Sequence, residues 1–202
     1  MRKIIATTFI TLDGVMQAPG GPVEDTTGDF RFGGWSFHYW DEMMGSTMNE
    51  IMNSPFDLLL GKRTYEIFAA YWPNNKSDSV VALKFNSTRK YVVSHSPSEL
   101  FWKNTTFLTT DVVKEVRKLK SENNQPDLWV HGSGNLIQTL LGHDLIDQFL
   151  VWTFPVTIGK GKRLFEESNK PAAYKLIDSK ISTTGVIIAT YSPAGTLKVG
   201  SF

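Results

Sequence analysis

The glycine turn Gly132-Ser-Gly134 is the part of this sequence best suited to binding a ligand. The apolar run Asp127–His131 precedes it, and apolar residues recur at helical spacing over 135–142. A strand that turns through glycines into a helix leaves the first backbone N–H groups of that helix unpaired, and the positive end of the helix dipole lies at the same place. Such a turn is a ready site for a phosphate group.

The same arrangement occurs earlier in the chain. The apolar run Phe56–Leu60 leads into Gly61-Lys-Arg-Thr64 and then into a helical pattern over 62–72. Cations at a helix N-terminus, here Lys62 and Arg63, are disfavoured by about 0.3–1 kcal/mol unless an anion compensates them. Two side chains that simply point into water would explain the same residues. With two such turns we expect a ligand that carries more than one phosphate, and a nicotinamide dinucleotide is the natural candidate.

A Rossmann fold is not the expected frame for these turns. Its fingerprint needs a third glycine, and position 137 is Ile. The fingerprint also belongs to the first strand–helix unit and is followed about 20 residues later by a ribose-binding acid. Gly132-Ser-Gly134 instead lies late in the chain. The sequence therefore disfavours ordinary Rossmann dehydrogenase chemistry.

Composition excludes several classes of site. The chain has no cysteine, so disulfides, thiol catalysis and zinc–thiolate sites are excluded. Its four histidines lack metal-ligand spacing, and we expect no metal site. The net charge is +1 and only Lys160-Gly-Lys-Arg163 is densely basic, so we expect no nucleic-acid partner. No apolar run approaches the roughly 20 residues of a membrane span, and no signal-peptide pattern is present. We expect no membrane partner and a cytoplasmic protein.

The elements that must position these turns alternate along most of the chain and change in kind at its end. A strand over 3–10 is followed by an irregular segment to about residue 38, which is rich in glycine and aromatic residues and is expected to be a lid or binding loop. We expect a single domain over 1–202. After the irregular segment we expect helices over 39–53, 62–72, 79–87, 112–122 and 135–142, with Asp111 as the cap of the fourth and a polar break over 73–78. Between and after them we expect strands over 56–60, 89–94, 105–109, 127–131 and 146–154, and a final hairpin of strands over 174–182 and 186–191.

Five short motifs, in order and spacing, resemble the dihydrofolate-reductase-like family, and more closely the stand-alone relatives of the reductase domain of bacterial riboflavin biosynthesis. The resemblance covers nearly the whole chain and implies an α/β fold with a mixed, mainly parallel sheet flanked by helices and a C-terminal antiparallel hairpin. The motifs are Thr11-Leu-Asp-Gly14, Leu58-Leu-Leu-Gly-Lys-Arg-Thr-Tyr-Glu66, Tyr91-Val-Val-Ser94, Leu128-Trp-Val-His-Gly-Ser-Gly134, and Pro155-x-x-x-Gly159-x-Gly161-x-x-Leu-Phe165, with Asp147–Phe154 preceding the last.

The resemblance also implies a cofactor, NADPH, lying across the edge of the sheet. Gly61, Lys62, Arg63 and Thr64 would hold a phosphate end at one helix N-terminus, while Gly132, Ser133, Gly134, Asn135 and Leu136 would cradle the pyrophosphate. Ser94 and His95 would lie near the adenosine ribose. The family pattern has an arginine after this serine, and a histidine is largely neutral near pH 7. NADH is therefore the alternative cofactor, and His95 could equally be a solvated loop residue.

The substrate end is less determined. The resemblance places Asp13 beside the substrate as the catalytic acid, whereas an aspartate before glycine is also a common turn. In the helix over 39–53, Asp41 and Glu50 fall at the flanks of the apolar face, so no acid is expected where folate reductases have one. The aromatic residues over 30–40 would stack on a flat heterocycle, pack a local core or cover a partner subunit. Lys160-Gly-Lys-Arg163 would bind a substrate phosphate or be a solvated loop.

His131 lies inside an apolar strand, and we expect it to be a core histidine with its hydrogen bonds satisfied. Taken together, these residues predict an NAD(P)H-dependent reductase of a small heterocycle. The resemblance implies a 5-amino-6-ribosylaminopyrimidine-type substrate or a pterin, and a homodimer. The alternative is a non-catalytic nucleotide-binding module that retains the fold.

Overall fold

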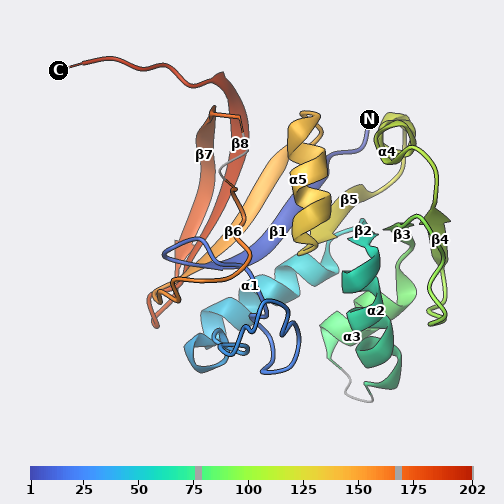
Figure 1. Ribbon diagram of the computed structural model, residues 1–202, viewed down its shortest axis with the longest axis horizontal. Coiled ribbons are helices and arrows are strands. Elements are labelled where there is room, and N and C mark those ends of the chain that lie inside the picture. The colour runs from blue at the N-terminus through green and yellow to red at the C-terminus, as the bar shows by residue number, and fades with distance from the viewer. Residues whose placement is uncertain (76–78, 167–169, 202) are drawn as a thin grey trace.

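The computed structural model describes residues 1–75, 79–166 and 170–201, and the strands of these residues form one eight-stranded sheet (Figure 1). In chain order the strands are β1 (Ile4–Thr11), β2 (Phe56–Gly61), β3 (Lys90–Val93), β4 (Thr105–Leu108), β5 (Asp127–His131), β6 (Gln148–Phe154), β7 (Ala172–Ile181) and β8 (Ile187–Thr196). Across the sheet their order is β4-β3-β2-β5-β1-β6-β8-β7.

The first six strands of that order, β4 to β6, are parallel to one another, whereas β8 runs antiparallel to both of its neighbours, β6 and β7. The predicted fold class, a mixed and mainly parallel sheet with a C-terminal hairpin, is therefore confirmed. Parallel strands have their carboxyl ends at one edge of the sheet, so the segments that follow β2, β3 and β5 must lie near one another. These segments begin at Gly61, Ser94 and Gly132.

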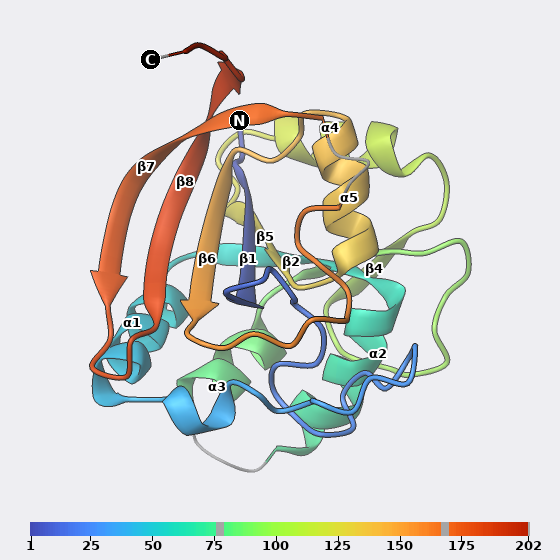
Figure 2. The same cartoon turned by 60° about the vertical axis from the view of Figure 1, so that its left-hand side comes forward.

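Helices cover both faces of the sheet (Figure 2). On one face, α4 (Val112–Ser121) and α5 (Gly134–Gly142) bury apolar residues such as Val116 and Ile137 against β1 and β5. On the other, α1 (Glu42–Asn53), α2 (Lys62–Tyr71) and α3 (Val80–Ser87) bury Met52, Tyr65 and Phe85. Two single-turn helices, η1 (Phe37–Tyr39) and η2 (Trp72–Asn74), flank α1 and α2.

The element boundaries match the expected ones closely, with two informative differences. The helix expected over 39–53 begins at Glu42, because the Asp41 carboxylate accepts the amide of Met44 and caps it. The last strand runs to Thr196 rather than to 191. Beyond Tyr191, β8 pairs with β7 but, among the described residues, not with β6. Proline has no N–H group to donate, and Pro193 is tolerated because no strand pairs with β8 on the β6 side at this position. Asp111 caps α4 as expected, and the polar break over 73–78 lies partly outside the described residues.

A buried ion pair ties the sheet together at the edge away from the glycine turns. The fully buried Arg2 side chain donates to Asp57 at 2.6 Å and to the Pro126 carbonyl, which joins the start of β1 to β2 and to the segment before β5. Arg89 also pairs with Asp57, at 3.1 Å. A charge buried this deeply is stable only while it is paired.

Replacing Arg2 with methionine removes the buried partner of Asp57 while keeping an apolar stem. We expect the Arg2→Met variant to lose about 3 kcal/mol of unfolding free energy, because the Asp57 carboxylate keeps only its more exposed partner Arg89. Urea unfolding measures the loss. The matched variant Lys3→Met changes an exposed neighbour and should alter the free energy by less than about 0.5 kcal/mol; equal effects of the two substitutions would contradict the expectation.

Candidate functional site

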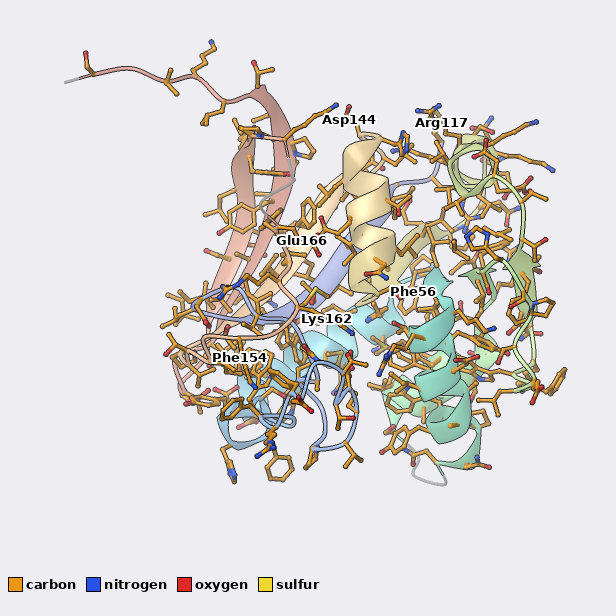
Figure 3. All side chains as sticks on the ribbon, in the orientation of Figure 1. Phe56, Arg117, Asp144, Phe154, Lys162 and Glu166 are labelled. Atoms are coloured by element: carbon orange, nitrogen blue, oxygen red, sulfur yellow. The ribbon has the colours of Figure 1, made fainter. Side chains whose placement is uncertain are left out.

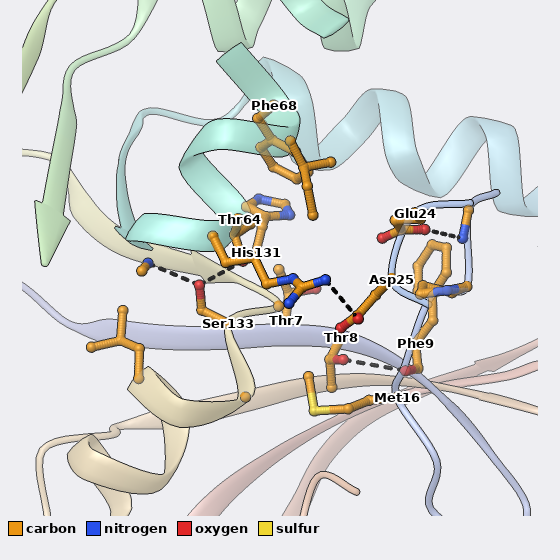
Figure 4. Close-up of a pocket in the computed structure, with 18 of the residues that line it drawn as sticks. Thr7, Thr8, Phe9, Met16, Glu24, Asp25, Thr64, Phe68, His131 and Ser133 are labelled. Carbon is orange, nitrogen blue, oxygen red and sulfur yellow. Dashed lines mark hydrogen bonds and ion pairs between the residues drawn. The ribbon is translucent and has the colours of Figure 1, made fainter. Parts of the chain in front are cut away.

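A cavity of about 940 Å³ opens at the carboxyl ends of β2, β3 and β5 (Figure 4). The segments after these three strands line it, as do Thr7–Phe9 of β1, parts of α1 and α2, and the loop over 16–25 that precedes α1. All eleven residues predicted to bind the cofactor line this one cavity: Gly61, Lys62, Arg63, Thr64, Ser94, His95, Gly132, Ser133, Gly134, Asn135 and Leu136. Their role in binding stays a prediction.

The hydroxyl of Ser133 joins the two glycine turns. It accepts the amide of Gly61 at 2.8 Å and donates to the Thr64 hydroxyl at 2.7 Å (Figure 4). Ser133 has a φ of 65° and Gly132 a φ of 64°, so two successive residues adopt the left-handed conformation that turns the chain out of β5. A Cβ on Gly61 would lie only 2.9 Å from the Ser133 Oγ. Glycine at 61 is therefore required by this contact.

Both helix N-termini keep their first amides free. Neither α2 nor α5 has a side-chain N-cap hydrogen bond. Within the described residues, no acceptor is recorded for the backbone N–H groups of 62–64 or of 134–136. Unpaired amides at the positive end of a helix dipole suit an anion. The two turns thus present six donors from neighbouring helices to the same cavity.

The turn after β3 adds hydroxyl groups and a cation. The Ser94 hydroxyl bonds to the carbonyl of Ser96 and accepts its amide, which fixes the turn. The Lys62 ammonium donates to the Ser96 hydroxyl at 3.0 Å, so this charge lies between α2 and the turn. His95 is exposed at the rim of the cavity.

Asp25 closes the loop over 16–25 onto the cavity. Its carboxylate pairs with Arg63 at 2.8 Å and with Lys162 at 2.6 Å, and Figure 3 shows Lys162 close to this loop. Burial opposes ionisation of Asp25, but hydrogen bonds from Lys162 and Thr27 outweigh it and hold the pKa of this carboxyl below its ordinary value. The sequence analysis missed Asp25, because an acid in an irregular glycine-rich segment carries no periodic signal.

Asp13, the predicted catalytic acid, is not among the residues that line the cavity. Its carboxylate accepts hydrogen bonds from the Thr11 hydroxyl and from the amides of Ile158 and Gly159, and Arg163 lies 3.7 Å away. The Thr11 hydroxyl is the main cause that lowers the pKa of Asp13, and the Gly159 amide adds to it. This geometry is that of a turn aspartate that holds two loops together, and the structure does not bring it to the other predicted residues.

The basic loop residues are partly engaged in the same contacts. Lys160 donates to the Asp29 carbonyl at 3.2 Å and Arg163 to the Gly159 carbonyl at 3.1 Å, while Lys162 pairs with Asp25. Lys160, Gly161 and Lys162 are exposed, which agrees with the interpretation of a solvated loop, and the binding of a substrate phosphate stays a prediction.

The far part of the cavity is aromatic and apolar. Trp40 stacks on Trp152 with ring centroids 5.9 Å apart, and Phe9 lies 5.2 Å from Trp152. The remaining wall residues come from α1, α2, η2 and α3: Met48, Ile51, Met52, Phe68, Trp72, Val81 and Phe85. Of the aromatic residues over 30–40, Trp40 lines the cavity whereas Phe30 is buried in a local core with Val15 and Ala18.

No acid projects from α1 into this aromatic part. Asp41 caps the helix and also accepts the amide and hydroxyl of Thr183. Glu50 pairs with Lys180 at 2.7 Å on the surface. The sequence predicted that Asp41 and Glu50 lie at the flanks of the apolar face of this helix, and the contacts of the two carboxylates agree with that prediction.

His131, at the end of β5, lines the cavity among the rings of Phe56, Phe85 and Trp129. Its Nε2 atom is buried without a hydrogen-bond partner in the described part of the chain. The expectation of a satisfied core histidine is therefore wrong: the strand pattern predicted burial, but the neighbours are aromatic rings that offer no acceptor. This burial lowers the pKa of His131 to about 3, so the imidazole is neutral at physiological pH.

Two further searches cover only the described residues. No group of three or more His, Cys, Asp or Glu side chains is placed to hold a metal ion there. No helix in the same residues has the length and apolar character needed to cross a bilayer.

Comparison with known proteins was made by sequence and by structure. Residues 2–189 match the family model described as the RibD C-terminal domain. The uncharacterized proteins YyaP and YwjB of Bacillus subtilis (strain 168) are similar in sequence: YyaP is 28% identical over 193 residues, which cover 94% of each chain, and YwjB is 22% identical over 182 residues.

Three solved structures share the fold. A protein described as belonging to riboflavin biosynthesis, from Shewanella sp. PV-4, superposes with a TM-score of 0.69 at 19% identity over 95% of this chain and 98% of its own. A pyrimidine reductase-like protein from Corynebacterium diphtheriae has a TM-score of 0.62 at 11% identity, covering 95% and 92%. Dihydrofolate reductase from Enterococcus faecalis, complexed with NADP(H), has a TM-score of 0.58 at 11% identity, covering 95% and 96%.

The contact between Gly61 and Ser133 predicts the effect of a single methyl group. In Gly61→Ala the new Cβ would overlap the Ser133 hydroxyl and push the two turns apart, so we expect dinucleotide affinity to fall at least tenfold. Titration with NADPH measures it. The matched variant Gly142→Ala, where no atom lies within 4 Å of the new Cβ, should bind normally and fold at least as stably. Unchanged affinity in Gly61→Ala would contradict the joined-turn geometry.

The lowered pKa of the buried His131 leads us to predict that the stability of the fold depends on pH. Its pKa of about 3 in the folded chain lies below the ordinary value of 6.5, so between these values the unfolded chain binds more protons at this position. The free energy of unfolding should therefore fall as the pH is lowered from about 6.5 towards 3. We expect His131→Phe to lose less stability than the wild type between pH 7 and pH 4.5 in urea unfolding. Parallel profiles would show that His131 is not buried as a neutral ring.

Proposed function

Because this chain belongs to the RibD C-terminal domain family, we propose that it is an NADPH-dependent reductase that transfers hydride to a small heterocyclic substrate. The family assignment and the fold confirm the resemblance expected from the five motifs. The observation that carries the proposal is the pair of helix N-termini, joined through Ser133, whose free amides face one cavity.

The residues fit a dinucleotide in their chemistry. Three amides at 134–136 and three at 62–64 suit two phosphate groups, and a cradle with no room for a side chain at Gly61 allows close approach of the backbone. Lys62, fixed against Ser96, supports NADPH over NADH because it supplies a charge for a 2′-phosphate where His95 does not. When bound, NADPH supplies the hydride.

The chain's own contribution is binding, orientation and exclusion of water. Arg63 is already paired with Asp25, so the loop over 16–25 covers the cavity and limits the access of solvent. The rings of Trp40, Trp152 and Phe9 form a wall against which a flat ring stacks. Such positioning is the main protein contribution in a reaction whose redox chemistry belongs to the cofactor.

For the substrate, a pyrimidine of the 5-amino-6-ribosylaminopyrimidine type is supported by the family and by the fold shared with a pyrimidine reductase-like protein. A pterin is less well supported, because α1 offers the cavity Met48, Ile51 and Met52 and no carboxylate. We propose that the protein acts as a homodimer in the cytoplasm. The exposed apolar side chains of Leu176, Ile177 and Ile181 on the edge strand β7 support a second copy of the chain as the partner.

A non-catalytic nucleotide-binding module is the second candidate. Two observations favour it. The Asp13 carboxylate is engaged by the amides of Ile158 and Gly159, away from the cavity, and the titratable group in the aromatic part, His131, is neutral. Such a protein would bind the dinucleotide and turn over nothing.

NADPH binding and oxidation test the proposal. Three of the six tryptophans line the cavity, so quenching of their fluorescence should report NADPH at micromolar concentrations. We expect Lys62→Ala to weaken NADPH about tenfold and NADH much less, because only the former carries the 2′-phosphate. The control Lys118→Ala changes an exposed lysine of α4 and should bind both cofactors as the wild type does.

Turnover separates the two candidates. Loss of NADPH absorbance with a pyrimidine, a pterin or a conjugated carbonyl compound supports the reductase, and quenching without turnover of any of them supports the binding module. No quenching by millimolar NADPH would rule out both.

A further inference from the structure

Reduction of a C=N or C=O group by hydride also requires a proton, which the nitrogen or oxygen atom of that group takes up. Helix α1 offers no carboxyl group to the cavity, and Asp13 is engaged by the Gly159 amide away from it. The Nε2 atom of His131 is buried, and with a pKa of about 3 this ring is no imidazolium at neutral pH. The proton therefore comes from water or from another side chain of the cavity wall.

One carboxyl group of the wall lacks a cationic partner. In the described part of the chain, the other ionisable side chains that line the cavity are Glu24, Asp25, Lys62, Arg63, His95 and Lys162. Asp25 pairs with two of the three cations, and His95 is exposed at the rim. Glu24 is half-buried and, among the described residues, forms no ion pair.

A tight turn of the loop over 16–25 holds Glu24 at the cavity. Its backbone amide donates to the Gly21 carbonyl at 3.2 Å, and its carboxyl Oε2 atom accepts the Gly20 amide at 2.7 Å. Figure 4 shows this last bond and the side chains of Glu24 and Asp25 on the same loop beside the pocket. The position of the Glu24 carboxyl group is thus set by backbone groups and not by a counter-ion.

The environment of Glu24 favours its protonated form. Loss of hydration raises the pKa of this carboxyl group, and the neighbouring Asp25 carboxylate adds to the rise, while the amides of Gly20 and Gly21 oppose it without cancelling it. Arg63 of α2 and Lys162 of the loop after β6 are engaged by Asp25, so neither stabilises a Glu24 carboxylate.

Two adjacent carboxyl groups are thus pushed in opposite directions. The hydrogen bonds of Asp25 with Lys162 and Thr27 outweigh the effect of its burial and lower its pKa, whereas the pKa of Glu24 is raised. Such a separation distinguishes an acid from an anion in an active site. A protonated carboxyl group has a single O–H donor. Because Oε2 of Glu24 accepts the Gly20 amide, the proton is carried by Oε1.

We propose that Glu24 is the proton donor of the reduction, and that its Oε1 atom gives the proton to the nitrogen or oxygen atom of the reduced bond. This proposal rests on the proposed reductase function. The substrate carbon accepts the hydride and its electron pair from NADPH, the π electron pair moves to the nitrogen or oxygen atom, and that atom takes the proton from Oε1. NADP⁺ and the Glu24 carboxylate remain, and water returns a proton to the carboxylate. Asp25 is a positioning residue that acts through Glu24.

The protonation of Glu24 is measurable without turnover. Carboxyl ¹³C NMR of the labelled glutamates, recorded for the protein alone and with NADP⁺, identifies the Glu24 signal by its loss in Glu24→Gln. We expect Glu24 to release its proton at a higher pH than the exposed glutamates do, because its carboxylate is poorly hydrated. A Glu24 signal that titrates together with the exposed glutamates, or below them, would overturn the proposal.

Turnover tests the role of the proton, with isatin as the C=O acceptor and 7,8-dihydrobiopterin as the C=N acceptor. In Glu24→Gln we expect kcat to fall about a hundredfold for any acceptor that the wild type reduces. KM and the affinity for NADP⁺ should stay within threefold, because glutamine has the size and the neutral charge of the protonated acid. Glu24→Asp keeps a carboxyl group and should recover part of the loss. The matched control Glu42→Gln, at an exposed position of α1 outside the cavity wall, should behave as the wild type does.

The pH profile separates proton donation from a structural role. The acid form is the donor, so kcat of the wild type should fall as the pH rises through the pKa of Glu24, and Glu24→Gln should lack this fall. Asp25→Asn removes a charge that raises this pKa and releases Arg63 and Lys162, so the fall should move to lower pH. A lower kcat with an unmoved profile in Asp25→Asn would show that Asp25 acts on the loop and not on Glu24, and would count against the proposal.

The two levels of inference fail separately. Turnover that Glu24→Gln retains removes Glu24 as the donor and leaves the reductase standing. A wild-type protein that binds NADPH but reduces neither acceptor removes the donor role together with the reductase, even where Glu24 titrates as expected. If Glu24→Gln does not fold, as judged by its thermal transition, the NMR signal that moves in Glu24→Asp and the profile of Asp25→Asn decide the question.

Discussion

The hydrogen bonds of the Ser133 hydroxyl are the contact on which the candidate site depends. They join the amide of Gly61 to the hydroxyl of Thr64, so the starts of α2 and α5 are held side by side at one edge of the sheet. The contact is available because β2 and β5 are adjacent parallel strands, whose carboxyl ends must emerge together. It also requires two unusual backbone choices, a left-handed Ser133 and a glycine at 61. Six free amides then face one cavity without any side chain competing for them.

The cavity divides its chemistry between two ends. At one end are the amides, Lys62 and the ion pairs of Asp25, where an anion gains partners. At the other are aromatic rings and the neutral imidazole of His131, where an anion would lose its hydration without compensation. This separation agrees with the proposed binding of a charged dinucleotide at the first end. The loop over 16–25 spans the boundary, since Asp25 reaches the cations and Ala18 belongs to a local core.

Much of the fold was predictable, and the failures have identifiable causes. Hydrophobic periodicity placed the helices and strands to within a few residues, and the Asp111 cap was read correctly. The last strand, which includes Pro193, was predicted too short. A proline argues against a strand in the middle of a sheet, and the sequence does not show that β8 has a partner on only one side at this position. His131 was expected to be satisfied, since a sequence shows that a residue is buried but not what surrounds it. Asp13 carries a motif, yet its carboxylate is engaged by Ile158 and Gly159, far along the chain.

By itself, the sequence determined the alternation of strands and helices, the two glycine turns and the family, because these depend on local conformation and on spacing along the chain. Only the tertiary structure decided which of these residues act together. It brought the three turns to one cavity, placed Asp25 between Arg63 and Lys162 beside that cavity, and left the Nε2 atom of His131 without a recorded hydrogen-bond partner among the described residues. The physical reason is that hydrogen bonding, charge pairing and burial are properties of neighbours in space. In this sheet β1 lies beside β5, so that Thr7 and His131 are neighbours although they are more than a hundred residues apart in the chain.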